Sequence, residues 1–381
     1  MTGHERFEAI IDGRKPDHLP IYFTAVACTV ASEILGREAH TGADSLHFKE
    51  ELSLLHGEQV HLEFEEKHLE DVTELWRKLG ADVVREVWRS QMKPTKRVGE
   101  YMLLFGDENG EHLVKRFYPE TQSYGVFHST YRQISPDDLA ARIKMELDDT
   151  PELSSTFKQT KAGLASSERL FARMGDNVGR IVPVPGVGFP FYDPSWLELS
   201  VTEPELIERW TMRAARYASN QIRRAAALGY RWFSGGGDMA GSGGPMISPQ
   251  TFRNILARPL RLIADTCAEL GVVYCYRSDG NLWPVFDDLF GETGIQAYGE
   301  ADRDATMTVG AIRARNPKLI VLGNTSSALL VSGTERQVRE DVRRQLDEAA
   351  GERFVSGLSN AVVHGTPVRN VYAMLEELKR G

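Results

Sequence analysis

Short apolar runs alternate with amphipathic stretches along most of the chain. Eight of these runs end in small or polar residues and are followed by a helical pattern, which is typical of strands in a parallel sheet. The runs are HLPIYF (18–23), ADVVREV (81–87), GRIVPVPG (179–186), YRWFSGG (230–236), VVYCYRS (272–278), GIQAYGE (294–300), LIVLGN (319–324) and FVSGLSN (354–360). Eight strands bounded by amphipathic helical sequence predict an α/β fold, a closed (β/α)8 TIM barrel.

The spacing between the predicted strands is compact after residue 230 and looser before it. Helical sequence precedes the first strand as an N-terminal extension, and residues 101–120 predict an inserted hairpin that turns at Asp107-Glu108-Asn109-Gly110. Residues 136–177 are polar and helical, which predicts an excursion outside the barrel. Residues 100–178 would then cover the barrel mouth or form a dimer surface, and both alternatives stay open.

We interpret residues 1–381 as a single barrel domain. A length of 381 residues would suggest two or three domains, but β/α barrels often reach this size as one unit. An open, doubly wound sheet is the structural alternative. We disfavour it because no segment resembles a dinucleotide-binding fingerprint.

Composition narrows the class of protein. Hydrophobic residues make up 41% of the chain and charged residues 26%, which is ordinary for a globular protein. The net charge of -9 argues against a nucleic-acid partner and against attraction to an anionic membrane. No apolar run approaches the roughly 18 residues that span a bilayer. Cys28, Cys267 and Cys275 form no CxxC pair, which predicts reduced thiols in a cytoplasmic protein.

The chemistry of a β/α barrel lies at the carboxyl ends of its strands. These ends are rich in polar side chains here, which indicates a site independently of any family. We predict that three carboxylates are catalytic, namely Asp279, Asp238 and Glu300. The predicted substrate-binding residues are Arg277, Asn281, Tyr298, Asn324, Asn360 and His364.

Arg277 and Asp279 lie two residues apart on one strand end, so both side chains point the same way. Arg277 would clamp a substrate carboxylate or phosphate, and Asp279 would act as a general acid or base. The alternative is an internal ion pair that closes the barrel mouth.

The other titratable candidates also have structural alternatives. Asp238 follows a glycine triplet and would be catalytic or a turn residue, while the glycine amides could bind an anion. Glu300 would accept a proton or orient a substrate, or else pair with Arg303 or cap a helix. His364 could titrate near neutral pH, with a surface histidine as the alternative.

No metal ligands are predicted. His61, Glu65 and His68 share one face of a predicted helix and have a spacing that metal ligands can use. Because Glu63, Glu66 and Lys67 surround them, we interpret this face as solvated.

Four segments carry a family resemblance. They are RFEAIIDGRKPDHLPI, SGGGDMAGSGGPMISPQTFRNILARPLRLI, GVVYCYRSDGNLWPVFDDL and SGLSNAVVHGTPVRNVYAMLEEL, within residues 5–23 and 225–378. In this order they resemble the first, fourth, fifth and last strands, with adjoining helices, of the uroporphyrinogen decarboxylase superfamily. That superfamily also contains corrinoid-dependent methyltransferases. The resemblance implies a β/α barrel that acts on a small molecule.

The chain departs from this superfamily at positions that carry chemistry in its members. The decarboxylase has an arginine-rich stretch after its first strand, whereas FTAVACTVASE here has no arginine before Arg37. It also has a histidine where this chain has Asn360. The thiol-methylating enzymes hold zinc through a His-x-Cys pair and a further Cys, and the matching positions here are Arg277, Asp279 and Asn360. Since an arginine cannot ligate a metal, the resemblance implies a shared scaffold with different chemistry.

These features favour a methyltransferase that moves a methyl group from a small, methoxylated or anionic donor to a corrinoid (cobalamin). The corrinoid is expected on a partner protein, because the chain shows no Asp-x-His-x-x-Gly type module. One alternative is a decarboxylase or lyase that acts on a carboxylated small molecule or a tetrapyrrole. Another is a non-catalytic ligand-binding barrel. Relatives of this fold often pair, so a homodimer is an expectation that the sequence leaves open.

Overall fold

The computed structural model describes residues 1–149 and 159–380. Eight parallel strands form a closed barrel in which neighbours follow chain order and the last strand pairs with the first. They are β1 (Ile21–Tyr22), β2 (Val83–Arg85), β7 (Gly179–Pro183), β8 (Trp232–Gly236), β11 (Val273–Arg277), β12 (Ala297–Ala301), β13 (Ile320–Thr325) and β14 (Phe354–Leu358). All eight predicted strands are confirmed, and the closed topology rules out the doubly wound alternative.

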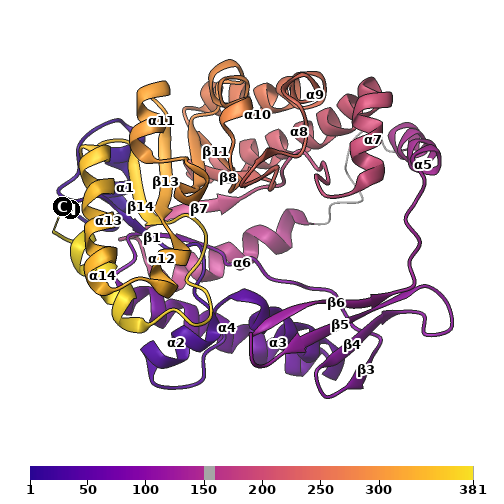
Figure 1. The fold of residues 1–381 in the computed structure, drawn as a ribbon, viewed down its shortest axis with the longest axis horizontal. Coiled ribbons are helices and arrows are strands. Elements are labelled where there is room, and N and C mark those ends of the chain that lie inside the picture. The colour runs from indigo at the N-terminus through magenta and orange to yellow at the C-terminus, as the bar shows by residue number, and fades with distance from the viewer. Residues whose placement is uncertain (150–158, 381) are drawn as a thin grey trace.

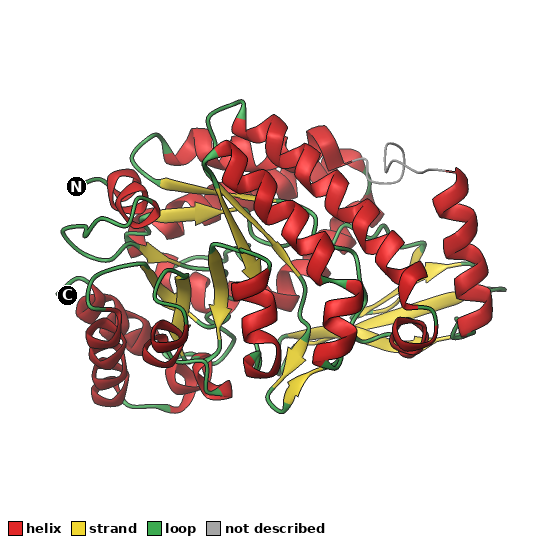
Figure 2. Cartoon of the chain, turned by 90° about the horizontal axis from the view of Figure 1, so that it is seen from above, coloured by secondary structure: helices red, strands yellow, loops and turns green. Residues whose placement is uncertain are grey.

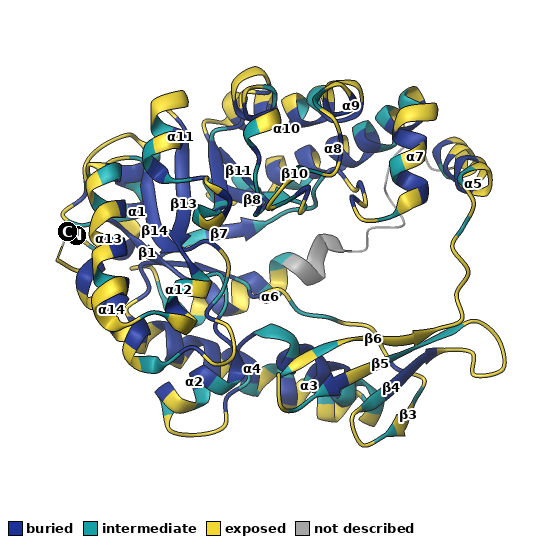
Figure 3. Ribbon diagram, in the orientation of Figure 1, coloured by how far each residue is buried: buried dark blue, intermediate teal, exposed yellow. Residues whose placement is uncertain are grey.

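Helices surround the barrel and connect its strands, and their inner faces carry the apolar residues of one large core (Figure 3). The helices up to β8 are α1 (Gly3–Ile11), α2 (Cys28–Leu35), α3 (Ala43–His56), α4 (Glu58–Leu79), α5 (Pro136–Asp149), α6 (Gln159–Met174), α7 (Pro194–Thr202) and α8 (Pro204–Ala226). The later ones are α9 (Pro249–Ile255), α10 (Ala257–Leu270), α11 (Val309–Arg315), α12 (Ser327–Ser332), α13 (Glu335–Ala349) and α14 (Val368–Leu378). Short 3-10 turns at Trp283–Val285 and Arg303–Ala305, a π-helical turn at Asp287–Glu292 and the hairpin strands β9 (Ala240–Gly241) and β10 (Gly244–Pro245) complete these connections. Among residues 1–149 and 159–380, no helix combines the length and apolar character that crossing a membrane requires.

The predicted N-terminal extension is α1, which closes the amino-terminal end of the barrel. A capping box starts this helix, with the Thr2 hydroxyl on the Glu5 amide and the Glu5 carboxylate on the Thr2 amide. Phe7 lies over the start of β7, where a Cβ on Gly179 would meet its ring at 2.5 Å. The centre of the Phe7 ring is 4.8 Å from that of Trp232. Glycine at position 179 therefore leaves room for the Phe7 ring, which closes this end of the barrel and is called the plug below.

The inserted hairpin belongs to a larger unit, a four-stranded antiparallel sheet at one side of the barrel (Figures 1 and 2). It consists of β3 (Lys96–Gly99), β4 (Met102–Gly106), β5 (His112–Tyr118) and β6 (Ser123–Ser129). The predicted hairpin is confirmed as β4 and β5, with the Gly110 amide donating to the Asp107 carbonyl in the turn. The sheet buries Leu103, Phe105 and Phe117 against Phe48 of α3, in a core separate from that of the barrel.

The prediction that residues 136–177 lie outside the barrel is wrong for their last part, and residues 150–158 fall outside the described residues. α6 runs into β7 and packs against it and against α4. Its Leu170 and Phe171 are buried in the barrel core, so this helix belongs to the helical layer. The prediction failed for α6 because only one narrow face of this helix is apolar, so its sequence is polar on average.

Replacing the plug should cost stability in proportion to its burial. Phe7 is 2% exposed, so we expect Phe7→Ala to lower the free energy of unfolding by about 3–5 kcal/mol. The matched control is Phe127→Ala in β6, where the ring is 55% exposed and the expected loss is under about 0.5 kcal/mol. Urea unfolding of both variants measures the difference, and equal losses would contradict the role of α1.

Candidate active site

The interior of the barrel mouth is charged. Side chains of β11 alternate between the two faces of the strand, so Cys275 and Arg277 share one face. Both are influenced electrostatically by Arg85 of β2, and Arg277 also by Tyr22 of β1. β1 and β2 lie across the barrel from β11, so this shared face points inward.

Arg277 forms an ion pair with Glu300 inside the mouth. Burial first, and the nearby Arg85 second, lower the pKa of Arg277 to about 10, so the guanidinium stays charged at neutral pH. Both partners are largely buried, with 20% and 12% of their side chains exposed. The alternative of an internal ion pair thus holds for Arg277, but its partner is Glu300 and not Asp279.

Glu300 reaches the interior because the strand is irregular there. The pairing of β12 with β13 shifts register between Tyr298 and Ala301, and Glu300 has a left-handed φ of 67°. A bulge of this kind can turn a side chain to the other face of a strand. A non-glycine residue in this conformation costs about 1–2 kcal/mol, and such strain is often found at functional sites.

Asp279 lies further out on the same strand end and differs from Glu300 in its surroundings. The Asn360 amide Nδ2 donates to its Oδ2 at 3.2 Å. Burial first, and Asp238 second, raise the pKa of Asp279 above its usual value. Asp238 and Asp279 both act on Tyr192, whose pKa is raised mainly by burial. The structure therefore brings Asp238, Asp279 and Asn360 together with Tyr192, which the sequence did not single out.

Two of the residues predicted to contact substrate are buried within the fold, and their side chains do not face the barrel mouth. Asn324 is fully buried. Its side-chain Nδ2 donates to the carbonyls of Ala301 and Met307, and its Oδ1 accepts a hydrogen bond from the Val309 amide. Tyr298 is fully buried beside Phe290, on the outer face of β12. Both residues were chosen because they lie at strand ends. The alternation of side chains along β12 directs Tyr298 away from the interior, and a buried turn does the same for Asn324.

The last two predicted contacts lie at the rim. Asn281 uses its Oδ1 to accept a hydrogen bond from the Trp283 amide, which shapes the turn after β11. His364 is exposed, and its Nδ1 lies 3.0 Å from the Thr29 hydroxyl. This placement agrees with the surface interpretation of His364.

The helix face of His61, Glu65 and His68 is not solvated, contrary to the sequence interpretation. His68 is buried, and its Nδ1 is 2.8 Å from the His40 carbonyl. Glu65 pairs with Arg89, the residue that follows β2 by four positions. The face is buried because α3, the connection between α2 and α3 and the segment after β2 pack over it.

The positions that hold zinc in the thiol-methylating enzymes are occupied by groups that bind one another or a neighbour. Arg277 pairs with Glu300, and Asn360 donates to Asp279. In the part of the chain that the structure describes, no cluster of three or more His, Cys, Asp or Glu residues has metal-binding geometry. The buried Cys275 nearby has a pKa raised by burial to about 12 and so stays a thiol. These residues do not fit the zinc site of those relatives.

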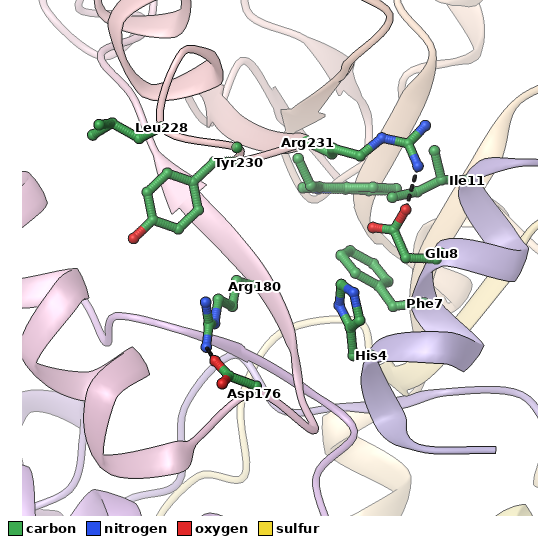
Figure 4. Close-up of a pocket in the computed structure, with 11 residues that line it drawn as sticks. His4, Phe7, Glu8, Ile11, Asp176, Arg180, Leu228, Tyr230 and Arg231 are labelled. Carbon is green, nitrogen blue, oxygen red and sulfur yellow. Dashed lines mark hydrogen bonds and ion pairs between the residues drawn. The ribbon is translucent and has the colours of Figure 1, made fainter.

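Two cavities lie at opposite ends of the barrel. The one in Figure 4, of about 460 Å³, lies at the amino-terminal end beside Phe7, and its arginines are paired as Arg180 with Asp176 and Arg231 with Glu8. The other, of about 610 Å³, lies between the carboxyl ends of β2 and β7, where Arg85 and Pro183 line it, and residues of α4, α6 and α8. Only the second lies at the carboxyl ends of strands, where a β/α barrel places its chemistry.

The fold and the mouth define a β/α barrel with a charged site at its carboxyl end. Within this class, residues 196–381 match the family model for uroporphyrinogen decarboxylase (URO-D). The family resemblance is therefore confirmed for this part of the chain, which contains the last five strands but not residues 5–23. No curated protein matches the sequence of the chain.

Solved structures support the fold. A methyltransferase from Methanosarcina mazei is similar over 100% of this chain and 99% of its own, with 15% identity and a TM-score of 0.67. A putative vitamin-B12 independent methionine synthase from Listeria monocytogenes is 11% identical over 95% of this chain and 96% of its own, with a TM-score of 0.43. The first likeness confirms the barrel, and the second is too distant to support an argument.

The raised pKa of Asp279 predicts a specific pH dependence. Because the folded pKa exceeds the unfolded value, the contribution of this group to stability is present at low pH and is lost as pH rises through the folded pKa. We therefore expect Asp279→Asn to become more stable relative to wild type between about pH 4 and about pH 8. The effect should be modest, since the carboxyl is only half-buried.

Asp287→Asn is the matched control, with the opposite sign. A hydrogen bond from Arg315 lowers the pKa of Asp287, so its contribution is present above the unfolded pKa and is lost at low pH. The urea midpoint of Asp279→Asn should therefore rise relative to wild type across this range, whereas that of Asp287→Asn should keep a constant offset and change only below about pH 4. Parallel trends would show that Asp279 titrates normally.

Proposed function

We propose that the chain is a methyltransferase that transfers a methyl group from a small anionic methyl ether to a corrinoid carried by a partner protein. The observation that carries the proposal is the arrangement at one barrel mouth of a buried cation, Arg277, and a carboxyl group with a raised pKa, Asp279. The URO-D match and the methyltransferase among the similar structures support the choice of reaction class.

Demethylation of an ether requires a proton at the departing oxygen. The bond between the methyl carbon and the ether oxygen breaks, and Asp279 donates a proton to that oxygen as the alcohol forms. The raised pKa of Asp279 increases the protonated fraction that can act as the acid. Water can then return a proton to Asp279, which is half-exposed at the mouth.

The remaining groups bind and orient the donor. Arg277 supplies positive potential deep in the mouth, and Glu300 holds its guanidinium in place. Asn360 fixes the Asp279 carboxyl through its hydrogen bond, and Asp238 beside it favours the protonated form. A bound corrinoid would supply the electron pair for the new bond to the methyl carbon.

A decarboxylase or lyase is the second candidate, because the same two groups serve it. Arg277 would hold a substrate carboxylate, and a protonated Asp279 would donate to the carbanion that remains after carbon dioxide leaves. A non-catalytic ligand-binding barrel is the third candidate. These candidates differ in whether they need a corrinoid and in what they release.

Incubation with reduced cob(I)alamin and 4-methoxybenzoate tests the proposal, with methylcobalamin followed by its absorbance. We expect Asp279→Asn to lower the rate about 100- to 10,000-fold, the usual contribution of a general acid. Asp287→Asn should keep the wild-type rate, because the Asp287 carboxylate is exposed and pairs with Arg315 of α11.

The other outcomes separate the candidates. Carbon dioxide release from a carboxylated substrate without corrinoid would replace methyl transfer with the lyase function. Binding of the ligand without methyl transfer or carbon dioxide release would leave the ligand-binding barrel.

A further inference from the structure

Arg85 is a buried cation without an ionic partner. It is the last residue of β2, it is 7% exposed, and its Nε has no hydrogen-bond partner. Within residues 1–149 and 159–380, no carboxylate lies within ion-pair distance of its guanidinium. Taking a charge out of water is unfavourable unless an opposite charge or hydrogen bonds compensate for it.

Other arginines with similarly buried side chains have such partners. Arg89, with 5% of its side chain exposed, pairs with Glu50 and Glu65. Arg213, with 4% exposed, pairs with Glu146. Arg85 differs from them in position as well, because it is on a barrel strand end.

The Arg85 side chain faces the barrel interior. Its charge lowers the pKa of Arg277, and it also acts on the Cys275 thiol, both on the inward face of β11. Glu300, the carboxylate inside the mouth, is already bound to Arg277. The other carboxylates of the mouth, Asp238 and Asp279, lie further out and make no ion pair with Arg85 in the described part of the chain.

The carboxylates that line the adjoining cavity already have partners. Glu86 accepts a hydrogen bond from Ser167 of α6, and Glu65 pairs with Arg89. The cavity that Arg85 lines has a volume of about 610 Å³, within the usual range for small-molecule sites. An anion that enters it would therefore meet Arg85 as a cation that no described carboxylate neutralises.

We propose that Arg85 binds an oxyanion group, a carboxylate or a phosphate, of the small-molecule ligand. The guanidinium offers a planar fork of donors that matches such groups. This inference deepens the proposed function, because it assigns the anionic end of the donor to β2 and the reacting end to Asp279. It does not depend on methyl transfer, so a binding measurement tests it without turnover.

The first experiment uses the wild-type chain with inorganic phosphate and with acetate. Thermal unfolding is followed as each oxyanion is added, with chloride at equal ionic strength as the reference. We expect one or both oxyanions to raise the unfolding temperature in a saturable way, and the stronger one identifies the preferred group. A response to neither beyond that to chloride would overturn the proposal.

The variant Arg85→Met then separates binding from structure. Removing an uncompensated buried charge should leave the free protein as stable as wild type or more stable. The same change should weaken oxyanion binding about 10- to 100-fold, as loss of a charge-assisted hydrogen bond does. Arg85→Lys, which keeps the charge but not the fork, should bind with intermediate affinity.

Arg224→Met is the matched control, because Arg224 lines the same cavity but is exposed on α8. It should keep the wild-type oxyanion response. If Arg85→Met unfolds or is destabilised, or if Arg224→Met loses binding while Arg85→Met keeps it, then Arg85 is structural and the proposal is wrong. A chain that binds oxyanions through Arg85 yet transfers no methyl group would refute only the proposed function.

Discussion

The closure of the barrel depends on one buried carboxylate. β1 has only two residues, and it pairs with β2 at a single position, Tyr22 with Val83. Asp82, 7% exposed, strengthens this seam, since its Oδ2 accepts the Ile21 amide at 3.0 Å and its Oδ1 accepts Arg6 of α1 at 2.9 Å. One side chain thus ties the plug helix, the first strand and the second strand together. Without this tie the seam between β1 and β2 would hold only by the pairing of Tyr22 with Val83 and by the hydrogen bond from the Asp82 amide to the Ile21 carbonyl.

A closed ring forces inward side chains of distant strands into one shared space. This constraint brings Arg85 and Tyr22 opposite Arg277, although some 190 residues or more separate them from it in the chain. Charges in such a space must be compensated from within it, because the strands exclude water from the sides. The bulge at Glu300 supplies that compensation for Arg277. The strained backbone of Glu300 is therefore understandable as the local cost of neutralising a buried cation.

The sequence predicts the barrel well, because the hydrophobic pattern of each strand and helix and the polar residues at each strand end are local signals. The eight strands, the β4–β5 hairpin and the grouping of Arg277, Asp279 and Asn360 follow from them. The rest depends on contacts between distant segments. Nothing local indicates that Asn324 turns away from the mouth, or that α6 packs on β7. Arg85 carried a weak signal, an arginine within the apolar run ADVVREV, but its lack of a partner is visible only in three dimensions.

Two carboxyl groups of the mouth, Glu300 and Asp279, have different surroundings. Glu300 is paired with the Arg277 guanidinium, whereas burial and Asp238 raise the pKa of Asp279. Two carboxyl groups in different surroundings can divide the roles of electrostatic support and proton donation. Because Glu300 already neutralises Arg277, an anionic ligand that approached Arg277 would have to displace it. The cation on β2 has no such competitor, so the electrostatics of the mouth favour binding of an anion at Arg85 over binding at Arg277.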